Sequence, residues 1–430
     1  MHISRHISSS WRTVAVTAAL TLAGSTLAGA SYGGDRDSEW VGTWATAVTH
    51  GNATGSTNLG LTDQSVRLVV RPTVGGSKIR IRLSNIYGEK TVTVGAATVA
   101  KSNKATPELS DIDPNTLRTL TFGGSGSASM VTGSELLSDP VNLRLGTLDD
   151  LVVSLYFPEN TGPTTFHGSS IQDNFVGPSN LVTQPGGAAY TLTRRCCWFF
   201  LSGVDVQTDD SDGSIVVLGD SITDGTNSTP NANNRWPDQL AERLAANAGH
   251  KSFPSVLNAG LAGSRLNHEG SEPSDNGAFP GFNEVGVNAL ARLNEDVFAQ
   301  TGVRTVITEL GVNDIWMSDD SAAEIIGALR QVNAQVKERG LRSLVSTITP
   351  FEGLSGTDSW TPAKEATRQA VNSYLRSSHE FDGVLDFDKV VRDPAHPSQL
   401  NPALDSGDHI HPNEAGCQAM AVSVPLNLVR

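Results

Sequence analysis

The apolar residues change their spacing near residue 210, and this change constrains the fold more than any other feature of the sequence. Before it, short apolar runs alternate with polar residues at a period of two. After it, continuous runs rich in Val, Ile and Leu alternate with segments of helical periodicity. The first pattern is typical of antiparallel strands with one buried face, and the second is typical of parallel sheets buried on both faces. The chain is therefore expected to combine an antiparallel β half with an α/β half.

The β half is expected to extend from Trp40 to about Val206. Gly, Pro and Asn residues separate its apolar runs, and no amphipathic helix interrupts them. The predicted strands include 66–70, 79–83, 92–94, 141–145 and 151–157. Such a series predicts an antiparallel β-sandwich or jelly-roll-like domain.

The α/β half is expected to hold a parallel sheet covered by helices. Its strands are predicted at 215–218, 256–257, 303–310, 344–348 and 384–387. Its helices are predicted near Trp236-Pro237 and at 285–298, 321–338, 362–376 and 413–424. The acidic stretch 207–213 lacks apolar residues to bury, which favours a linker. We therefore predict an accessory β domain at 34–206, a linker at 207–213 and an α/β domain at 214–430.

The first 30 residues have the features of a secretory signal peptide. Arg5 and Arg12 supply positive charge, 13–24 is a short apolar run, and Ala28-Gly29-Ala30 is a small-residue cleavage site. The apolar run is shorter than the roughly 20 residues that span a bilayer, which disfavours a membrane anchor. We expect a secreted, extracellular protein with no stable membrane association.

The net charge limits the expected binding partners, and the cysteine content limits the possible disulfide bonds. The chain has 31 Lys and Arg residues against 45 Asp and Glu residues, a formal net charge of −14, so nucleic acid is not an expected partner. Three cysteines do not make a disulfide framework. Cys196 and Cys197 are adjacent and could form only a strained vicinal bridge, while one of them could pair with Cys417. We favour buried, unpaired cysteines over either bridge.

Ser221 follows a predicted strand in the segment Gly219-Asp220-Ser221-Ile222-Thr223-Asp224-Gly225. The carboxyl edge of a parallel sheet is where α/β proteins build their sites. A serine hydroxyl is a weak nucleophile that needs a base, a group orienting this base, and donors for the oxyanion. The segment Asp408-His409-Ile410-His411-Pro412 offers His411 as the base and Asp408 as the orienting carboxylate.

Two further segments follow predicted strands at the same edge, 258–264 and Gly311-Val312-Asn313-Asp314. A glycine N–H can approach a substrate closely, and an asparagine amide can donate into the same space. The predicted catalytic residues are therefore Ser221, Asp408 and His411. The predicted oxyanion donors are Ser221, Gly263 and Asn313, and the scheme needs no cofactor and no metal.

These four segments, in this order, resemble the SGNH hydrolase superfamily, also called the GDSL esterase/lipase family. The resemblance covers the second half of the chain and implies a flavodoxin-like α/β/α sandwich, hydrolysis of carboxylic esters without a metal, and the roles given above. Together with 40–44 and Arg235-Trp236-Pro237, the whole chain resembles a secreted two-domain branch that includes carbohydrate esterases. A departure is Ser264, where close secreted members tend to have asparagine. This departure affects the expected substrate contacts rather than the catalytic roles.

The carboxylates beside these segments have structural interpretations. Asp220 is expected to stabilise the turn, because neighbours in sequence usually point apart. We expect Asp224 to cap the following turn and Asp314 to orient Asn313 or its loop. The Gly-x-Ser-x-Gly elbow of α/β-hydrolases is disfavoured because Thr223 occupies the final glycine position.

Several histidines and asparagines could have roles other than ester hydrolysis. His409 and His411 could suggest a metal site, but no third ligand stands at a sensible spacing. His167 is expected to be a surface or hydrogen-bonded core histidine outside the site. Asn52 and Asn227 each begin an acceptor pattern for N-glycosylation.

We expect a serine esterase, with a small acyl group on a carbohydrate, such as acetyl on a polysaccharide, as the favoured substrate. The alternative among enzymes is a lipase or phospholipase that acts on longer acyl chains. The alternative from another class is a catalytically silent carbohydrate-binding protein. Hydrolysis of esters of increasing acyl length distinguishes the three.

Overall fold

The computed structural model of the chain describes residues 39–51, 59–106, 108–193, 196–249, 251–270, 286–356 and 359–430. The predicted signal peptide at 1–30 and the acceptor Asn52 lie outside the described residues. The segment from Ser38 to Arg430 forms one compact unit.

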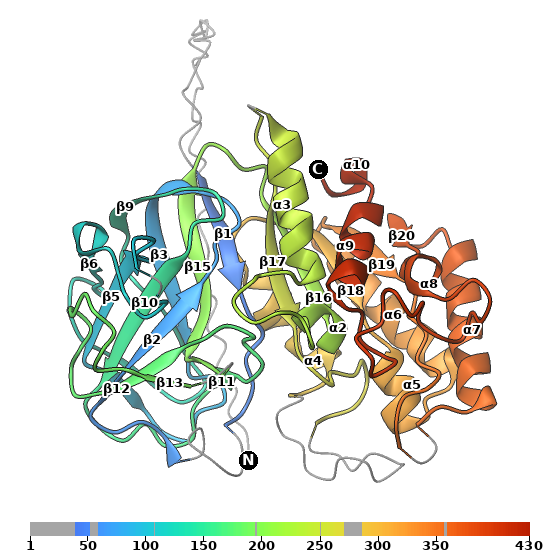
Figure 1. Ribbon diagram of the computed structural model, residues 1–430, viewed down its shortest axis with the longest axis horizontal. Helices are drawn as coiled ribbons and strands as arrows, with labels where there is room; N and C mark the ends of the chain where they lie inside the picture. Colours follow the sequence, from blue (N-terminus) through green and yellow to red (C-terminus); the bar gives the residue numbers. More distant parts are fainter. Residues whose placement is uncertain are drawn as a thin grey trace, which may run out of the picture. The chain divides into compact units, whose positions relative to one another are not determined.

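The N-terminal part is built from two antiparallel sheets, as the alternation predicted (Figure 1). The first sheet has the order β1-β15-β3-β8, with β9 also paired to β3. Its strands are β1 (Glu39–Ala45), β15 (Leu201–Thr208), β3 (Gly76–Ser84), β8 (Glu135–Leu137) and β9 (Val141–Leu145). The second sheet has the order β13-β12-β2-β10-β5-β6. Its strands are β13 (Thr191–Leu192), β12 (Phe175–Pro178), β2 (Gln64–Val70), β10 (Leu151–Phe157), β5 (Ala96–Lys101) and β6 (Arg118–Thr119).

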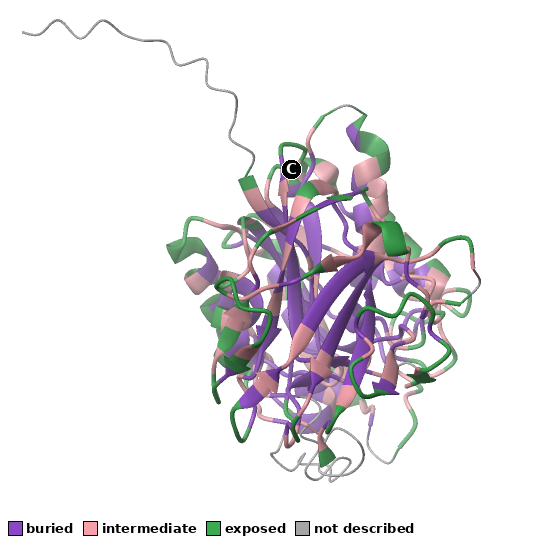
Figure 2. Cartoon of the chain, turned by 90° about the vertical axis from the view of Figure 1, so that its left-hand side faces the viewer, coloured by how far each residue is buried: buried purple, intermediate pink, exposed green. Residues whose placement is uncertain are grey.

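One core joins the two antiparallel sheets. Ile79 and Val204 of the first sheet belong to the same buried cluster as Leu68 and Val153 of the second. Figure 2 shows these strands with most of their residues buried. The shared core makes this part a β-sandwich. Smaller pieces complete it, namely β11 (Phe166–His167) paired with β14 (Trp198–Phe199), β4 (Val92–Val94) paired with β7 (Ala128–Met130), and the 3₁₀ helix η1 (Pro114–Thr116).

The C-terminal part contains a five-stranded parallel sheet in the order β17-β16-β18-β19-β20. Its strands are β17 (Ser255–Gly260), β16 (Ser214–Gly219), β18 (Val303–Glu309), β19 (Arg342–Ser346) and β20 (Gly383–Leu385). Written in chain order this is 2-1-3-4-5, the flavodoxin-like order, whose ligand site lies at the carboxyl ends of the strands. The predicted flavodoxin-like sheet is confirmed.

Helices cover this sheet, and local capping explains where several begin. They are α2 (Ser221–Asp224), α3 (Trp236–Ala248), α4 (Ala289–Arg292), the π-helix η3 (Leu293–Phe298), α5 (Val312–Ser318), α6 (Ala322–Glu338), α7 (Pro362–Ser377), α8 (Phe387–Val391), α9 (Glu414–Ser423) and α10 (Leu426–Val429). Ser321 and Glu324 form a capping box at the start of α6, and Asn413 caps α9. Helix α3 contacts α9, and α6 contacts α7 (Figure 1).

Three sequence predictions need correction. The run expected as a strand at 384–387 ends at Leu385, because Asp386 caps α8 and Phe387 opens that helix. The helix expected at 285–298 begins at Ala289 after its cap Asn288 and continues as a π-helix, while Val285 lies outside the described residues. Cys196 and Cys197 are joined in a disulfide, and Cys417 is free and buried, so only Cys417 agrees with the prediction of unpaired cysteines.

Strands β1 and β17 bring the sandwich against the parallel sheet. The hydroxyls of Ser214 and Ser255, at the starts of β16 and β17, both donate to the carbonyl of Gly42 in β1. Thr73 accepts from the backbone N–H of Val256 and donates to its carbonyl. Strand β15 ends at Thr208 and β16 begins at Ser214, so 209–213 connect the last strand of the sandwich to the parallel sheet. None of the helices in the described residues is long and apolar enough to cross a membrane.

Candidate active site

Ser221 is the first residue of α2, directly after the carboxyl end of β16. The preceding Asp220 caps the helix and accepts from the backbone N–H of Ile222 at 3.0 Å. A Cβ atom at Gly219 would lie 2.3 Å from Thr223 Oγ1, so this tight turn has room only for glycine. The backbone N–H groups of a first helical turn have no partner within the helix, and that of Ser221 is therefore available for a ligand.

His411 and Asp408 lie beside Ser221. His411 Nε2 is 2.7 Å from Ser221 Oγ, and His411 Nδ1 is 2.5 Å from Asp408 Oδ2. Because an ionised carboxylate only accepts hydrogen bonds, Nδ1 carries the proton and Nε2 is left to accept from the serine hydroxyl. The structure thus connects the three predicted catalytic residues by two hydrogen bonds.

The environment of Asp408 favours its charged form. Partial burial acts to raise its pKa, but the side chain of His411 and the backbone N–H groups of His411 and Ile410 outweigh this effect and hold the pKa well below its usual range. The two backbone bonds, at 2.9 and 3.1 Å, both reach Oδ1. Asp408 is therefore a carboxylate at neutral pH.

Asn227 and Ser406 also contact this carboxylate, and sequence reasoning did not include either in the site. Asn227 Nδ2 donates to Asp408 Oδ2 at 2.7 Å, and Ser406 Oγ donates to Asp408 Oδ1 at 3.1 Å. The only sequence signal at Asn227 was its glycosylation pattern, which says nothing of this contact. A turn-forming serine two residues before an aspartate gave no signal either.

Two of the three predicted oxyanion donors, Gly263 and Asn313, lie on segments that contact each other. Gly263 has a φ of 77°, a left-handed conformation that glycine adopts without strain. Asn313, in the first turn of α5, donates one amide hydrogen to the carbonyl of Ser264 at 3.1 Å. An amide nitrogen carries two hydrogens, so the second remains for a ligand. Asn258 ties the glycine-containing loop to α2 by donating to the carbonyl of Thr223 at 2.8 Å.

Three carboxyl groups are buried beneath these loops. Burial raises the pKa of Asp220 to about 7 and that of Asp314 to about 7. Burial and the nearby Asp220 raise the pKa of Glu309 well above its usual range, and Glu309 accepts from Thr223 Oγ1 at 2.9 Å. Asp314 accepts from the backbone N–H of Leu266, so it supports the loop after Gly263 rather than Asn313 or its own loop, as had been predicted.

The remaining acidic and histidine residues of the sequence analysis have hydrogen-bond partners other than Ser221 and His411. His409 Nδ1 is 2.7 Å from Asp405 Oδ2, so His409 and His411 are paired with different carboxylates. Asp224 was predicted to cap a turn, but its carboxylate instead contacts His167 of the sandwich at 3.0 Å. His167 is buried and hydrogen-bonded, which agrees with one of its two predicted interpretations.

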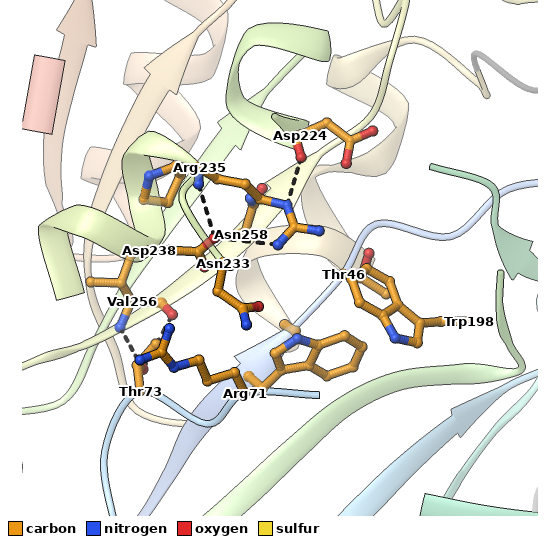
Figure 3. A pocket seen from close by; sticks show the side chains of 13 residues that line it. Thr46, Arg71, Thr73, Trp198, Asp224, Asn233, Arg235, Asp238, Val256 and Asn258 are labelled. Carbon is orange, nitrogen blue, oxygen red and sulfur yellow. Dashed lines mark hydrogen bonds and ion pairs between the residues drawn. The ribbon is translucent and has the colours of Figure 1, made fainter. Parts of the chain in front are cut away.

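A pocket lies beside Asp224, where residues of the sandwich face residues of the parallel sheet and α3 (Figure 3). Trp44 and Trp198 line it from the sandwich, with ring centroids 4.9 Å apart. Arg235 donates to the carbonyl of Asp224 at 2.8 Å and to the carboxylate of Asp238 at 3.2 Å. The first contact attaches the start of α3 to the end of α2, and the second lies within the first turn of α3.

Residues 217–419 match the model of the GDSL-like lipase/acylhydrolase family. This part of the chain is a GDSL-like lipase/acylhydrolase domain. The predicted SGNH superfamily membership is confirmed for this part of the chain, which is a hydrolase domain of the GDSL type. The acylhydrolase domain includes Ser221, Asp408 and His411 within the matched residues.

Solved structures of similar proteins are related only distantly to this acylhydrolase. A family two carbohydrate esterase from Cellvibrio japonicus is 13% identical, with 90% of this chain and 93% of that chain covered and a TM-score of 0.33. An acetylxylan esterase from Geobacillus stearothermophilus is 20% identical, with 50% and 92% covered and a TM-score of 0.36. A GDSL-like lipase from Bacteroides thetaiotaomicron is 14% identical, with 49% and 84% covered and a TM-score of 0.33. No curated protein matches the chain.

Proposed function

We propose that the protein is a secreted serine esterase in which Ser221, His411 and Asp408 form a catalytic triad. The single observation that carries the proposal is the pair of contacts at His411, with Ser221 Oγ 2.7 Å from Nε2 and Asp408 Oδ2 2.5 Å from Nδ1. A base that is within hydrogen-bond reach of a hydroxyl and is itself oriented by a carboxylate is the arrangement that nucleophilic acyl transfer requires.

The reaction proceeds in two halves. Ser221 Oγ attacks the ester carbonyl carbon while its proton passes to His411 Nε2, and the carbonyl oxygen becomes an oxyanion held by Ser221 N, Gly263 N and Asn313 Nδ2. The C–O bond to the alcohol breaks, and the alcohol leaves with the proton from His411. Water then attacks the acyl-serine with His411 as the base, which releases the carboxylic acid and restores Ser221. Asp408 stabilises the imidazolium formed in each half.

The proposed substrate is a small acyl ester of a carbohydrate, such as an acetylated polysaccharide. This choice rests on the resemblance to a two-domain branch that includes carbohydrate esterases, and on the sandwich that packs beside the acylhydrolase domain through β1 and β17. Release from the cell rests on the signal-like residues 1–30. Neither nucleic acid nor a membrane is a proposed partner.

The proposed function is tested with a panel of acetylated polysaccharides, feruloylated oligosaccharides and phospholipids, together with aryl esters of increasing acyl length. Released acid is measured for the unaltered chain and for Ser221→Ala. Activity that is confined to acetyl esters and is lost in Ser221→Ala supports the proposal. Preference for long acyl chains would indicate a lipase, and glycan binding without hydrolysis would indicate the silent binding protein. Near-normal activity of Ser221→Ala would exclude this nucleophile.

A further inference from the structure

His167 belongs to the β-sandwich but reaches the acylhydrolase domain three residues after Ser221. Its ring is buried, with Nε2 3.0 Å from Asp224 Oδ1 and Nδ1 2.8 Å from the carbonyl of Ala47. Its backbone is fixed on both sides, because Phe166 exchanges hydrogen bonds with Thr49 and β11 pairs with β14. The imidazole is therefore held by a rigid part of the sandwich.

The contacts of His167 define its protonation. The carbonyl oxygen of Ala47 can only accept, so Nδ1 carries a hydrogen. Nε2 faces the carboxylate of Asp224 and, at 3.2 Å, the carbonyl of Ser169, which also accept. Opposite an ionised Asp224 both ring nitrogens donate, and the ring is then an imidazolium. Burial opposes this charge and so does Arg235, but Asp224 and Ala47 outweigh them and raise the pKa of His167.

The second carboxylate oxygen of Asp224 contacts the loop that contains Gly263, the proposed oxyanion donor. Oδ2 accepts from the backbone N–H of Ala262 at 3.2 Å, and Ala262 directly precedes Gly263. The two ends of this loop have backbone contacts, since Leu261 N donates to Gly219 O and Ser264 N donates to Leu261 O. The tip at Ala262 is held by the side chain of Asp224 instead.

We propose that His167 is a positioning residue of the esterase site. As a buried cation on the sandwich, it fixes the carboxylate of Asp224, which in turn fixes the loop that presents the Gly263 N–H to the oxyanion. The sandwich thereby contributes to catalysis through an ion pair rather than by touching substrate. This inference rests on the proposed function of Ser221 and Gly263 and adds a role for a residue outside the matched acylhydrolase segment.

The test compares His167→Leu, His167→Gln and Asp224→Asn in the full chain, with 4-nitrophenyl acetate as substrate. The first variant removes both donors, and the second keeps an amide N–H that can reach Asp224. Asp224→Asn removes the ion pair, because the amide is uncharged and can keep its contact with Ala262 only by turning an N–H toward His167, whose Nε2 must then give up its proton. Even if His167→Leu does not fold, the two nearly isosteric variants keep the test decisive.

The matched control is Thr73→Val. Thr73 also joins the sandwich to the parallel sheet, through two hydrogen bonds to Val256, but it does not contact Asp224. We expect Thr73→Val to lower the unfolding temperature while kcat per folded molecule is unchanged. A role of His167 in stability alone predicts the same behaviour for His167→Leu.

The expected result is a fall in kcat of about 10- to 100-fold for His167→Leu and Asp224→Asn with KM nearly unchanged, because a misplaced oxyanion donor affects the transition state more than the bound ester. His167→Gln should lie between His167→Leu and the unaltered chain. The rate of inactivation by an aryl phosphonate, whose P–O oxygen occupies the same hole, should fall in parallel.

Two outcomes would overturn the inference. One is a kcat at the level of the unaltered chain in folded Asp224→Asn or His167→Leu. The other is a loss in Thr73→Val as large as the loss in His167→Leu per folded molecule. Ser221→Ala distinguishes failure of this inference from failure of the proposed function. If Ser221→Ala is active, the assignment of Ser221 as the nucleophile is refuted. If Ser221→Ala is inactive while His167→Leu is fully active, only the role of His167 is refuted.

Discussion

Asn227 Nδ2 donates to Asp408 Oδ2 at 2.7 Å, the same carboxylate oxygen that contacts His411 Nδ1. The amide also reaches Ser406 Oγ at 3.1 Å. Asn227 has a φ of 66°, a conformation that asparagine tolerates better than most residues. The carboxylate of Asp408 is thus prevented from rotating away from the imidazole by a residue that lies six positions after Ser221 in the sequence.

Replacement of Asn227 tests this contact. We expect Asn227→Ala to lower kcat by about 3- to 10-fold, since a hydrogen bond to a charged group contributes on the order of 2 kcal/mol and only part of it acts on the orientation of His411. Asn233→Ala is a matched control, because Asn233 also has a positive φ, 52°, in the same segment, but its amide donates to the carbonyl of Asn231 rather than to Asp408. Equal kcat values for the two variants would show that Asn227 does not position the carboxylate.

The pH dependence of activity should show a single acid limb. A protonated His411 cannot accept from Ser221, so kcat/KM falls as pH falls. The pKa of Asp408 is held well below its usual range, so this residue stays charged throughout the limb. A plot of log(kcat/KM) against pH should therefore have a limiting slope of about one. A limiting slope near two would indicate that a second essential group titrates with His411.

Asp408→Asn should lower kcat by about 10³- to 10⁴-fold, because the neutral amide no longer fixes the proton on Nδ1. The measurement is kcat on an aryl acetate, with the unfolding temperature as the check on folding. A loss of less than about tenfold would indicate that His411 keeps its orientation without Asp408.

Asp314→Asn should change how stability depends on pH. Burial raises the pKa of Asp314 to about 7, so between the unfolded pKa and this value the folded chain holds one proton more than the unfolded chain. Stability of the unaltered chain therefore falls as pH rises through this interval. Asn is neutral at every pH. From pH 5 to pH 8, the free energy of unfolding of the variant should therefore rise by on the order of 2 kcal/mol relative to that of the unaltered chain.

The free energy of unfolding in urea, measured at both pH values, checks the prediction for Asp314. Asp139→Asn is the control, because hydrogen bonds from Thr121 and Gly124 lower the pKa of Asp139. The Asp139 carboxylate contributes its full stabilisation above the pKa of the unfolded chain and loses it only as pH falls through the lower pKa of the folded chain. The difference in unfolding free energy between Asp139→Asn and the unaltered chain should therefore be constant from pH 5 to pH 8. A constant difference for Asp314→Asn as well would contradict a raised pKa at that position.

Asn313→Ala should lower kcat by about 10²- to 10³-fold with little change in KM, as expected for the loss of an oxyanion donor. Asn333→Ala is a matched control, since both asparagines are buried, both donate to a backbone carbonyl, and neither Oδ1 has a hydrogen-bond partner within the described residues. Asn333→Ala should reduce stability without reducing kcat. If the two variants lose kcat equally per folded molecule, Asn313 is not an oxyanion donor.

Much of the fold could be predicted because its signals are local. The strands β9 and β10 have the bounds expected from their alternation. Where competing local signals met, the prediction failed, as at Phe387, where a capping aspartate ended an apolar run that was expected to continue as a strand. The disulfide between Cys196 and Cys197 gave no periodic or turn signal that could have favoured it.

By itself, the sequence determined the two kinds of secondary structure and the order of the four site segments, because periodicity, turn residues and short motifs depend on neighbours along the chain. Only the tertiary structure decided which side chains meet. The 2.7 Å contact between His411 and Ser221 spans 190 positions, and the contact between His167 and Asp224 spans 57. Such contacts depend on strand order and on the packing of the sandwich against the parallel sheet, which no local pattern encodes. For this reason Asp224 was expected to cap a turn, although in the folded chain it links the sandwich to the loop beside Ser221.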